Sequence, residues 1–272
     1  MARGAFQQKV VVITGGCAGI GRALALRFAQ SGARIAILDV QDEPLLAFQQ
    51  QLMDKLNAEV LAIRCDVADP QACEQAICQV LEHFGGIDLL INNAGITHRS
   101  TFAETDLAVF QRIMAVNYFG ALHCTQQALP SIVQRQGQII VLSSLSGFAP
   151  LLYRSAYNAS KHALHGLFET LRMEVRPQGV NVMLVTPGFT ATDIRKNALV
   201  GDGSISKQII NTPFKVSSPS DVADDIYRGA VKRKRLMVLS NVNWRARLLA
   251  RWFPGLFERW MLPRLSGVKP QR

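Results

Sequence analysis

The sequence predicts a doubly wound α/β fold, in which helices cover both faces of a parallel sheet of about seven strands. Short runs rich in β-branched residues alternate with longer segments whose apolar residues recur every three or four positions. The short runs are apolar on both faces, which is typical of strands buried beneath helices on either side. With 49% apolar residues, no low-complexity run and no internal repeat, the 272 residues fit one large globular domain.

These two patterns place the individual elements. Seven runs are predicted strands: 10–14, 34–38, 59–64, 87–92, 138–143, 180–185 and 236–240. Four intervening segments have helical period: 21–30, 71–84, 110–134 and 156–176. Residues 189–218 lack a clear period and mix Gly, Asp, Ser and Pro, so we interpret them as a lid or substrate loop. We expect one domain over 1–241 and a basic, aromatic extension over 242–272.

The excess positive charge lies at the C-terminus. The formal net charge is +10, and residues 232–272 contain eleven of the 30 Lys and Arg but one of the 20 acids, Glu258. In the rest of the chain, basic and acidic residues are equal in number, so we expect no nucleic-acid partner.

The five cysteines are odd in number and lack metal-binding spacing, which favours a reduced cytoplasmic compartment and no metal site. The first residues lack the apolar run of a signal peptide, and no window resembles a membrane span.

A glycine-rich turn, "TGGCAGIG", joins the first predicted strand to the first helix. Glycines there let the backbone approach a pyrophosphate at the positive end of the helix. The predicted cofactor contacts in this turn are Gly15, Cys17, Gly19, Ile20 and Gly21.

Asp39 ends the second strand, eighteen residues beyond Gly21, where an acid can accept hydrogen bonds from an adenosine ribose. Its carboxylate would repel a 2′-phosphate, and neither Ala18 nor Val40 offers a cation to hold one. The sequence therefore favours NAD over NADP. The alternative for Asp39 is an ordinary turn or helix-capping residue.

The segment "YNASK" places Tyr157 and Lys161 four residues apart, on one face of a predicted helix. A nearby lysine cation lowers the pKa of a tyrosine, which can then exchange a proton with an alcohol or carbonyl. Ser144 lies thirteen residues before Tyr157, just past the fifth strand, and can hydrogen-bond the same substrate oxygen. These three side chains predict a proton-transfer site.

Taken together, the motifs resemble those of the short-chain dehydrogenase/reductase family, with its Rossmann-like fold, over roughly residues 8–240. The order is "TGGCAGIG", "CDVAD", "NNAG", "MAVNYFG", "SSLSG", "YNASK" and "PGFTATD". The resemblance implies that Asn117 holds a water in a proton relay through Lys161, which also binds ribose. It implies further cofactor contacts from Asp66, Val67, Asn93, Ala94, Gly95, Pro187, Gly188, Thr190 and Thr192. We also expect a homo-oligomer, either a dimer or a tetramer.

The residues around the predicted site favour a lipophilic alcohol or ketone as substrate. The segment after Ser144 is "LSGFAPLLYRS", and the lid contains Phe189, Ile194, Leu199, Ile205, Ile209, Ile210 and Phe214. His98 is a candidate for the pocket lining, whereas His162 and His165 lack partners at metal spacing.

Two other functions stay open. The first is a sugar-nucleotide epimerase or dehydratase, which the glycine spacing disfavours. The second is a non-catalytic NAD-binding scaffold, which would not need Tyr157 and Lys161.

The C-terminal extension is predicted to form two short amphipathic helices divided by Pro254-Gly255. One face of the first gathers Trp244, Leu248, Leu249 and Trp252, and one face of the second gathers Leu256, Phe257, Trp260 and Met261. Arginines opposite such a face suit an anionic membrane surface. Packing over the lid or against a second subunit explains the pattern equally well, so both interpretations stay open.

Overall fold

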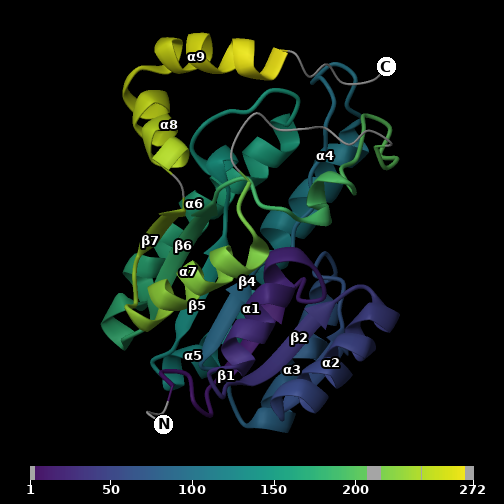
Figure 1. The fold of residues 1–272 in the computed structure, drawn as a ribbon, viewed down its shortest axis with the longest axis vertical. Helices are drawn as coiled ribbons and strands as arrows, with labels where there is room; N and C mark the ends of the chain where they lie inside the picture. The colour runs from purple at the N-terminus through teal and green to yellow at the C-terminus, as the bar shows by residue number, and fades with distance from the viewer. Residues whose placement is uncertain (1–3, 207–215, 240, 267–272) are drawn as a thin grey trace.

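The computed structural model describes residues 4–206, 216–239 and 241–266. Within them, seven strands form one parallel sheet in the order β3-β2-β1-β4-β5-β6-β7 (Figure 1). The strands are β1 (Val10–Thr14), β2 (Arg34–Asp39), β3 (Val60–Arg64), β4 (Leu89–Asn92), β5 (Gln138–Leu142), β6 (Asn181–Pro187) and β7 (Leu236–Leu239). The predicted doubly wound fold is confirmed.

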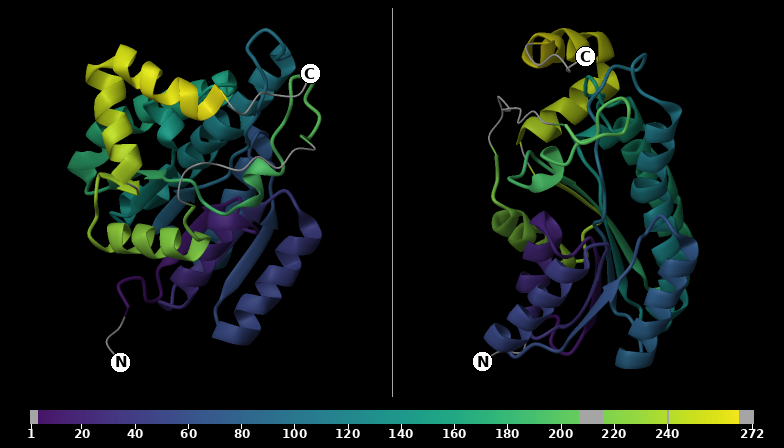
Figure 2. Two further views of the ribbon diagram at one scale, coloured as in Figure 1. Left: turned by 45° about the horizontal axis from the view of Figure 1, so that its top comes forward. Right: turned by 90° about the vertical axis from the view of Figure 1, so that its right-hand side faces the viewer.

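Helices cover both faces of this sheet, which lies edge-on between them in the right-hand view of Figure 2. One layer contains α1 (Gly19–Ala29), α2 (Asp42–Leu56) and α7 (Pro219–Val231). The other contains α3 (Pro70–Phe84), α5 (Gly120–Gln134) and α6 (Ser155–Val175), and α4 (Leu107–Met114) packs against α6. In β1, Val11 packs into the first layer and Val10 and Val12 into the second, so the whole strand is apolar.

Two helical segments differ from the sequence prediction. Residues 42–56 form α2, although no helix was predicted there, and Leu45, Phe48 and Leu52 give it a buried face of helical spacing. The predicted helix 110–134 is interrupted by a π-helical turn, η1 (Ala115–Phe119), between α4 and α5. One wider turn leaves the apolar spacing almost unchanged, so periodicity alone does not reveal it.

The strand order fixes where a ligand can bind. Strands β2 and β4 both pair with β1, so the chain reverses its direction across the sheet between β3 and β4. Crossover loops on the two sides of such a switch point diverge, and they leave a crevice at the carboxyl ends of the strands. The glycine-rich turn after β1 and the segment after β4 border this crevice.

The C-terminal extension forms two helices, α8 (Asn241–Trp252) and α9 (Pro254–Ser266), as predicted. They lie at the end of the molecule opposite the N-terminus (Figure 1). Phe257 and Met261 are buried against Leu145, Ala149 and Leu151, which follow β5. This face of the extension therefore packs on the segment after β5, whereas the predicted contacts with the lid or a second subunit stay predictions.

The rest of the extension is more open than the predicted faces suggest. Leu256 is 54% exposed and Trp252 is 71% exposed, although both were assigned to apolar faces. The reason is that each helix meets the core along a narrow line, so only part of its broad apolar face is covered. The side chain of Trp244 lies outside the described residues. None of the described helices is both long and apolar enough to span a membrane.

Candidate active site

The glycine-rich turn is tied to the segment after β4 by Asn93. Its side-chain amide donates to the carbonyls of Thr14 (2.9 Å) and Gly15 (2.8 Å). In return, the hydroxyl oxygen of Thr14 accepts from the backbone amides of Asn93 and Ala94, both at 3.0 Å. Asn93 and Ala94 were predicted to contact the cofactor, and the structure shows that their hydrogen bonds fix the conformation of the turn.

Three of the glycines are required by the geometry of this turn. Gly15 and Gly19 have φ angles of +62° and +52°, in the left-handed region that favours glycine. A Cβ on Gly21 would lie 2.1 Å from the Gly15 carbonyl oxygen, and a Cβ on Gly19 would lie 2.9 Å from Cγ2 of Thr192. The absent side chains leave backbone amides open at the start of α1, as a bound pyrophosphate needs.

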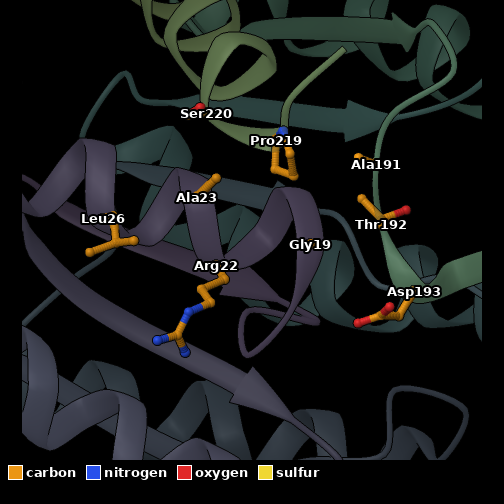
Figure 3. A pocket seen from close by; sticks show the side chains of 9 residues that line it. All are labelled: Gly19, Arg22, Ala23, Leu26, Ala191, Thr192, Asp193, Pro219 and Ser220. Carbon is orange, nitrogen blue, oxygen red and sulfur yellow. The ribbon is translucent and has the colours of Figure 1, made fainter. Parts of the chain in front are cut away.

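An open cavity of about 360 Å³ lies beside the turn, as Figure 3 shows. Its walls come from α1, the loop after β6 and the start of α7: Gly19, Arg22, Ala23, Leu26, Ala191, Thr192, Asp193, Pro219 and Ser220. Arg22 points away from Thr192 and Pro219 in this view, and its guanidinium stacks 3.9 Å from the ring centre of Phe48. Of the predicted cofactor contacts, Gly19 and Thr192 line this cavity.

Asp39 lies at the carboxyl end of β2 and is 7% exposed. Its carboxylate accepts from the backbone amides of Cys17 (2.9 Å) and Gln41 (3.3 Å), which fixes its position beside the turn. Burial and the neighbouring carboxylate raise the pKa of the Cys17 thiol to about 12. Cys17 therefore stays a neutral thiol in the wall of this site.

The structure brings Ser144 and Tyr157 together at the carboxyl edge of the sheet. Ser144 precedes the short helical turn η2 (Leu145–Gly147), and its hydroxyl oxygen accepts from the amide of Ser146 at 3.2 Å. Tyr157, in the first turn of α6, is 7% exposed. Burial raises the pKa of Tyr157 above its ordinary value, and the positive charge of Arg154 and the nearby Ser144 offset only part of this rise.

Lys161 lies one turn beyond Tyr157 and is buried. Its ammonium group donates to the carbonyl of Leu142, the last residue of β5, at 2.8 Å, and lies 5.7 Å from the ring centre of Tyr157. Burial lowers the pKa of Lys161 to about 8. The hydrogen bond to the backbone of β5 thus fixes the ammonium group of Lys161 near the ring of Tyr157.

Asn117 lies in the π-helical turn, and both the nitrogen and the oxygen of its side-chain amide are hydrogen-bonded. The amide nitrogen donates to the carbonyl of Ile96 and to the hydroxyl of Ser160, both at 3.0 Å, and its oxygen accepts from the amide of Ile96 at 2.8 Å. Asn117 thereby ties the segment after β4 to α6. The predicted water relay through Lys161 stays a prediction.

Comparison with known proteins decides the family. The family model described as short chain dehydrogenase matches residues 9–201. The chain belongs to the short-chain dehydrogenase/reductase family. It is 37% identical to dehydrogenase/reductase SDR family member 7B of Bos taurus, over 94% of this chain and 81% of that protein. A 7-like member from Drosophila melanogaster is 34% identical over 86% of this chain and 73% of its own length.

Two solved structures share the fold of this family member. A short-chain dehydrogenase/reductase from Burkholderia phymatum, in complex with NAD, superposes with a TM-score of 0.82 and 25% identity, over 93% of this chain and 96% of that one. An alcohol dehydrogenase from Thermococcus sibiricus, complexed with 5-hydroxy-NADP, superposes with a TM-score of 0.75 and 25% identity. The match covers 86% of this chain and 97% of that one. These neighbours support a nicotinamide cofactor, and together they include both of its forms.

The remaining predicted cofactor contacts lie around the same cleft. Asp66 is exposed after β3 and accepts from the amide of Ala68 at 3.0 Å, while Val67 is buried against Gly120. Thr190 donates to the carbonyl of Gly188 at 3.1 Å, which shapes the loop that follows Pro187. Gly95 leaves room for Asn117 and Lys161, since a Cβ there would lie 3.3 and 3.6 Å from their side-chain atoms. Ile20 is half-buried and packs on the core beneath the turn.

The lid is only partly described. Leu199 is buried and Ile205 is 59% exposed, whereas Ile209, Ile210 and Phe214 lie outside the described residues. His98 is completely buried, and burial together with Arg154 lowers its pKa to about 4, so it is neutral. In the described part of the chain, no three His, Cys, Asp or Glu side chains gather where they could hold a metal.

Arg154, which no motif in the sequence marks, is the cation whose charge lowers the pKa of Tyr157. It ends the loop before α6, three residues ahead of the tyrosine. A basic residue so close to the predicted proton-transfer group is the signal that could have identified it.

Proposed function

We propose that the protein is an NAD(H)-dependent oxidoreductase that acts on a secondary alcohol or ketone. The observation that carries this proposal is Tyr157, which is buried at the carboxyl edge of the sheet, with the Lys161 ammonium group 5.7 Å from its ring centre. Such a phenol can exchange a proton with the oxygen of an alcohol or a ketone, and the Lys161 cation would favour its phenolate form. It lies at the end of the cleft that begins at the glycine-rich turn.

The residues divide the chemistry among them. A bound nicotinamide supplies or accepts the hydride. Ser144 donates a hydrogen bond that orients the substrate oxygen, and Tyr157 removes the hydroxyl proton from an alcohol or returns it to a ketone. Lys161 and Arg154 favour the phenolate by their positive charge. Lys161 also binds the ribose, and Asn117 holds the water through which the proton reaches solvent.

Replacement of Tyr157 by phenylalanine tests this mechanism. The variant keeps the aromatic ring in its buried site but removes the oxygen that exchanges the proton. We expect Tyr157→Phe to bind NADH as the parent does, by fluorescence titration, and to lose at least about a hundredfold in turnover, the lower limit for general acid–base catalysis. Unaltered turnover would reject the mechanism, and lost NADH binding would show that the residue acts on cofactor binding instead.

NAD is favoured over NADP because Asp39, at the end of β2, would accept hydrogen bonds from the adenosine ribose. Its carboxylate is fixed by two backbone amides and would lie beside the 2′-phosphate of NADP. Ala18 and Val40 offer no cation, and the Arg22 guanidinium is engaged by the ring of Phe48 and the side chain of Gln51. The ratio of kcat/KM for NAD and NADP measures this preference directly.

A lipophilic substrate is supported by the apolar residues next to the catalytic groups. Leu145, Ala149 and Leu151 follow Ser144, and α9 covers them with Phe257 and Met261. Screening alcohols with NAD, by the absorbance of NADH, tests this assignment. Long-chain or steroid-like alcohols should be turned over better than small polyols, and equal turnover would contradict it.

We also propose that the enzyme works in the cytoplasm, at an anionic membrane surface. The corner between α8 and α9 exposes an apolar ridge, which consists of Leu248, Trp252, Phe253 and Leu256. The exposed arginines Arg251 and Arg259 flank it, and basic and aromatic side chains in this combination suit the headgroup region of a bilayer. Such an orientation would bring the substrate end of the sheet toward lipid.

Flotation with vesicles tests this placement. The full-length protein should float with vesicles containing phosphatidylserine and less with neutral vesicles. Trp252→Ser combined with Phe253→Ser should abolish flotation, whereas Leu46→Ser, which changes a 62% exposed leucine on α2, should not. If both variants float like the parent, the ridge does not bind lipid. A change in oligomeric state in the double variant alone would identify a second copy as its partner.

A further inference from the structure

Ser143 lies between the last residue of β5 and Ser144, and two hydrogen bonds hold it in place. Its backbone amide donates to the carbonyl of Val185 in β6 at 2.8 Å. Its side-chain oxygen lies 3.0 Å from Nε2 of His165 on α6. Ser143 is buried, so solvent does not compete for this hydrogen bond. Neither Ser143 nor His165 has a part in the proposed proton transfer.

His165 follows the proton-transfer residues along α6. Tyr157, Lys161, His165 and Glu169 occur at intervals of four residues, so each lies one helical turn from the next. Nδ1 of His165 lies 3.5 Å from Oε1 of Glu169. A serine, a histidine and a carboxylate are thus connected in series, and the first of them adjoins Ser144. We call this set the Ser143–His165–Glu169 series.

The surroundings of His165 define its protonation state. Burial lowers its pKa, and the hydrogen bond and charge of Glu169 offset only part of this decrease. Arg247 and His162 lower the pKa further, so the imidazole is neutral at pH 7. A carboxylate can only accept a hydrogen bond, which places the single ring proton on Nδ1. Nε2 is therefore an acceptor, and the hydroxyl of Ser143 donates to it.

Gly147 in η2 packs directly against this hydrogen bond. A Cβ at position 147 would lie 2.3 Å from Oγ of Ser143 and 2.8 Å from Nε2 of His165, so a side chain there would displace one of them. Because Ser143 is 5% exposed and lies against Gly147, its hydroxyl is closed to a substrate, although the series has the composition of a nucleophilic triad. The series instead supports the turn to which Gly147 belongs.

The same turn fixes the orientation of Ser144. The side-chain oxygen of Ser144 accepts from the amide of Ser146 at 3.2 Å, and its carbonyl accepts from the amide of Gly147 at 2.9 Å. The place of Gly147 thus influences the direction of the Ser144 hydroxyl. Since Gly147 packs on the hydrogen bond between Ser143 and His165, that bond acts on Ser144 through the turn.

Apolar contacts also hold η2 in place. Leu145 packs in one cluster with Phe257 and Met261 of α9. Such contacts are non-directional, whereas a hydrogen bond has a preferred length and angle. The bond from Ser143 to His165 is therefore the contact that sets how the turn is oriented.

We propose that the Ser143–His165–Glu169 series positions the hydroxyl of Ser144 for the reaction. Glu169 selects the tautomer of His165, His165 holds Ser143, and Ser143 supports the turn that contains Ser144. His165 is thus a positioning residue that acts through other residues. The inference rests on the proposed function, because it assigns a further role in the same reaction. A displacement of about 1 Å can lower a rate by about a hundredfold, so loss of the bond should be visible in kcat.

Two variants of His165 separate hydrogen bonding from packing. His165→Leu removes the acceptor, whereas the side-chain amide in His165→Gln reaches the place of Nε2 and can accept from Ser143. With NAD and 2-decanol, His165→Leu should lower kcat by about tenfold or more and leave the Kd for NADH within about twofold of the parent. His165→Gln should recover most of kcat, and Ser143→Ala should lose as much as His165→Leu. The control is His162→Leu, which changes an exposed histidine on the same helix and should leave kcat unchanged.

The action through Ser144 is tested in a Ser144→Ala background. There, His165→Leu should lower kcat by less than about twofold, because the hydroxyl that it positions is already absent. A further loss of about tenfold in this background would overturn the proposal, because His165 would then act on another group. Equal kcat in the parent and His165→Leu, or equal losses in the leucine and glutamine variants, would overturn it as well.

Nuclear magnetic resonance tests the positioning without turnover. In the ¹⁵N-labelled complex with NADH, the backbone amide resonances of Ser144, Ser146 and Gly147 should shift in His165→Leu and in Ser143→Ala, and less in His165→Gln. Unchanged resonances in both of the first two variants would overturn the inference, even if activity were lost. Urea unfolding establishes that each variant is folded, and Ser143→Ala serves alone if His165→Leu is not. Failure of the parent to oxidise 2-decanol would instead count against the proposed function.

Discussion

Substitution of Gly21 by alanine tests whether the glycine-rich turn has the close approach that cofactor binding needs. The new Cβ would lie 2.1 Å from the carbonyl oxygen of Gly15 and 2.5 Å from the side-chain nitrogen of Asn93. The first of these is a backbone atom, and Asn93 is held by two hydrogen bonds, so neither can rotate away. The turn must open by about 1 Å to relieve the contact.

The expected cost follows from these contacts. Overpacking in a rigid site costs about 1–3 kcal/mol, and loss of the hydrogen bond from Asn93 to Gly15 adds about 1 kcal/mol. Gly166→Ala is the matched control, because this glycine is exposed within α6 and a Cβ there meets nothing within 4 Å. Alanine should stabilise that helix by about 0.5–1 kcal/mol. The change from glycine to alanine should therefore lower the free energy of unfolding at position 21 and raise it at position 166.

Two assays check this prediction. In urea unfolding of the cofactor-free protein, Gly21→Ala should lower the free energy of unfolding by about 2–4 kcal/mol, while Gly166→Ala should raise it slightly. In fluorescence titrations with NADH, Gly21→Ala should weaken binding by at least about tenfold, since 1.4 kcal/mol of lost contact suffices. If Gly21→Ala unfolds and binds NADH as the parent does, the described turn geometry is wrong.

Three further substitutions probe other parts of the site and the fold. Asp39→Ala removes the carboxylate beside the ribose, so the ratio of kcat/KM for NAD over NADP should fall by about tenfold or more; an unchanged ratio would remove Asp39 from the cofactor site. Folding lowers the pKa of Lys161 from 10.5 to about 8. Below pH 8 both the folded and the unfolded chain are protonated there, so the cost of burying the charge is fully present, and it fades as the pH rises from about 8 to 10.5. Lys161→Met should therefore be more stable than the parent at pH 7, by about 1 kcal/mol after loss of the bond to Leu142, with an advantage that shrinks above pH 8 and with turnover abolished. Asp88→Ala removes a buried carboxylate that pairs with Lys9 (2.9 Å) and Arg135 (3.1 Å) at the opposite edge of the sheet. It should destabilise the fold by about 3 kcal/mol but leave the Kd for NADH unchanged; a weaker Kd would show that this edge is coupled to the site.

Most of the fold could be predicted because its signals are local. Strand β1 and the predicted run 10–14 coincide, since a fully buried parallel strand is an unbroken apolar run. The predicted strand 87–92 begins two residues too early, because Asp88 there binds Lys9 and Arg135 before β4 starts at Leu89. Helix α2 has the expected spacing of Leu45, Phe48 and Leu52, but its many exposed polar residues weaken the pattern.

Part of the candidate site could also be predicted from local signals, and part could not. Chain order and spacing were enough to bring Ser144, Tyr157 and Lys161 to one edge of the sheet, because α6 places residues four apart on one face. They did not reveal that Asn93 holds the glycine-rich turn, that Asn117 bridges Ile96 and Ser160, or that Arg154 acts on Tyr157. Each of these depends on loops that are far apart in the chain and meet only in the folded sheet.

The sequence by itself determined the doubly wound sheet, the glycine-rich turn, the proton-transfer residues and the two helices of the extension. Each of these follows from spacing along a single strand, turn or helix, which the chain specifies before it folds. Only the tertiary structure decided that Phe257 and Met261 are buried while Trp252 and Leu256 are exposed, and that Asn93 holds the glycine-rich turn. Which side of an amphipathic helix is covered, and which side chain supports a turn, depends on distant segments of the chain that meet only once the sheet has formed.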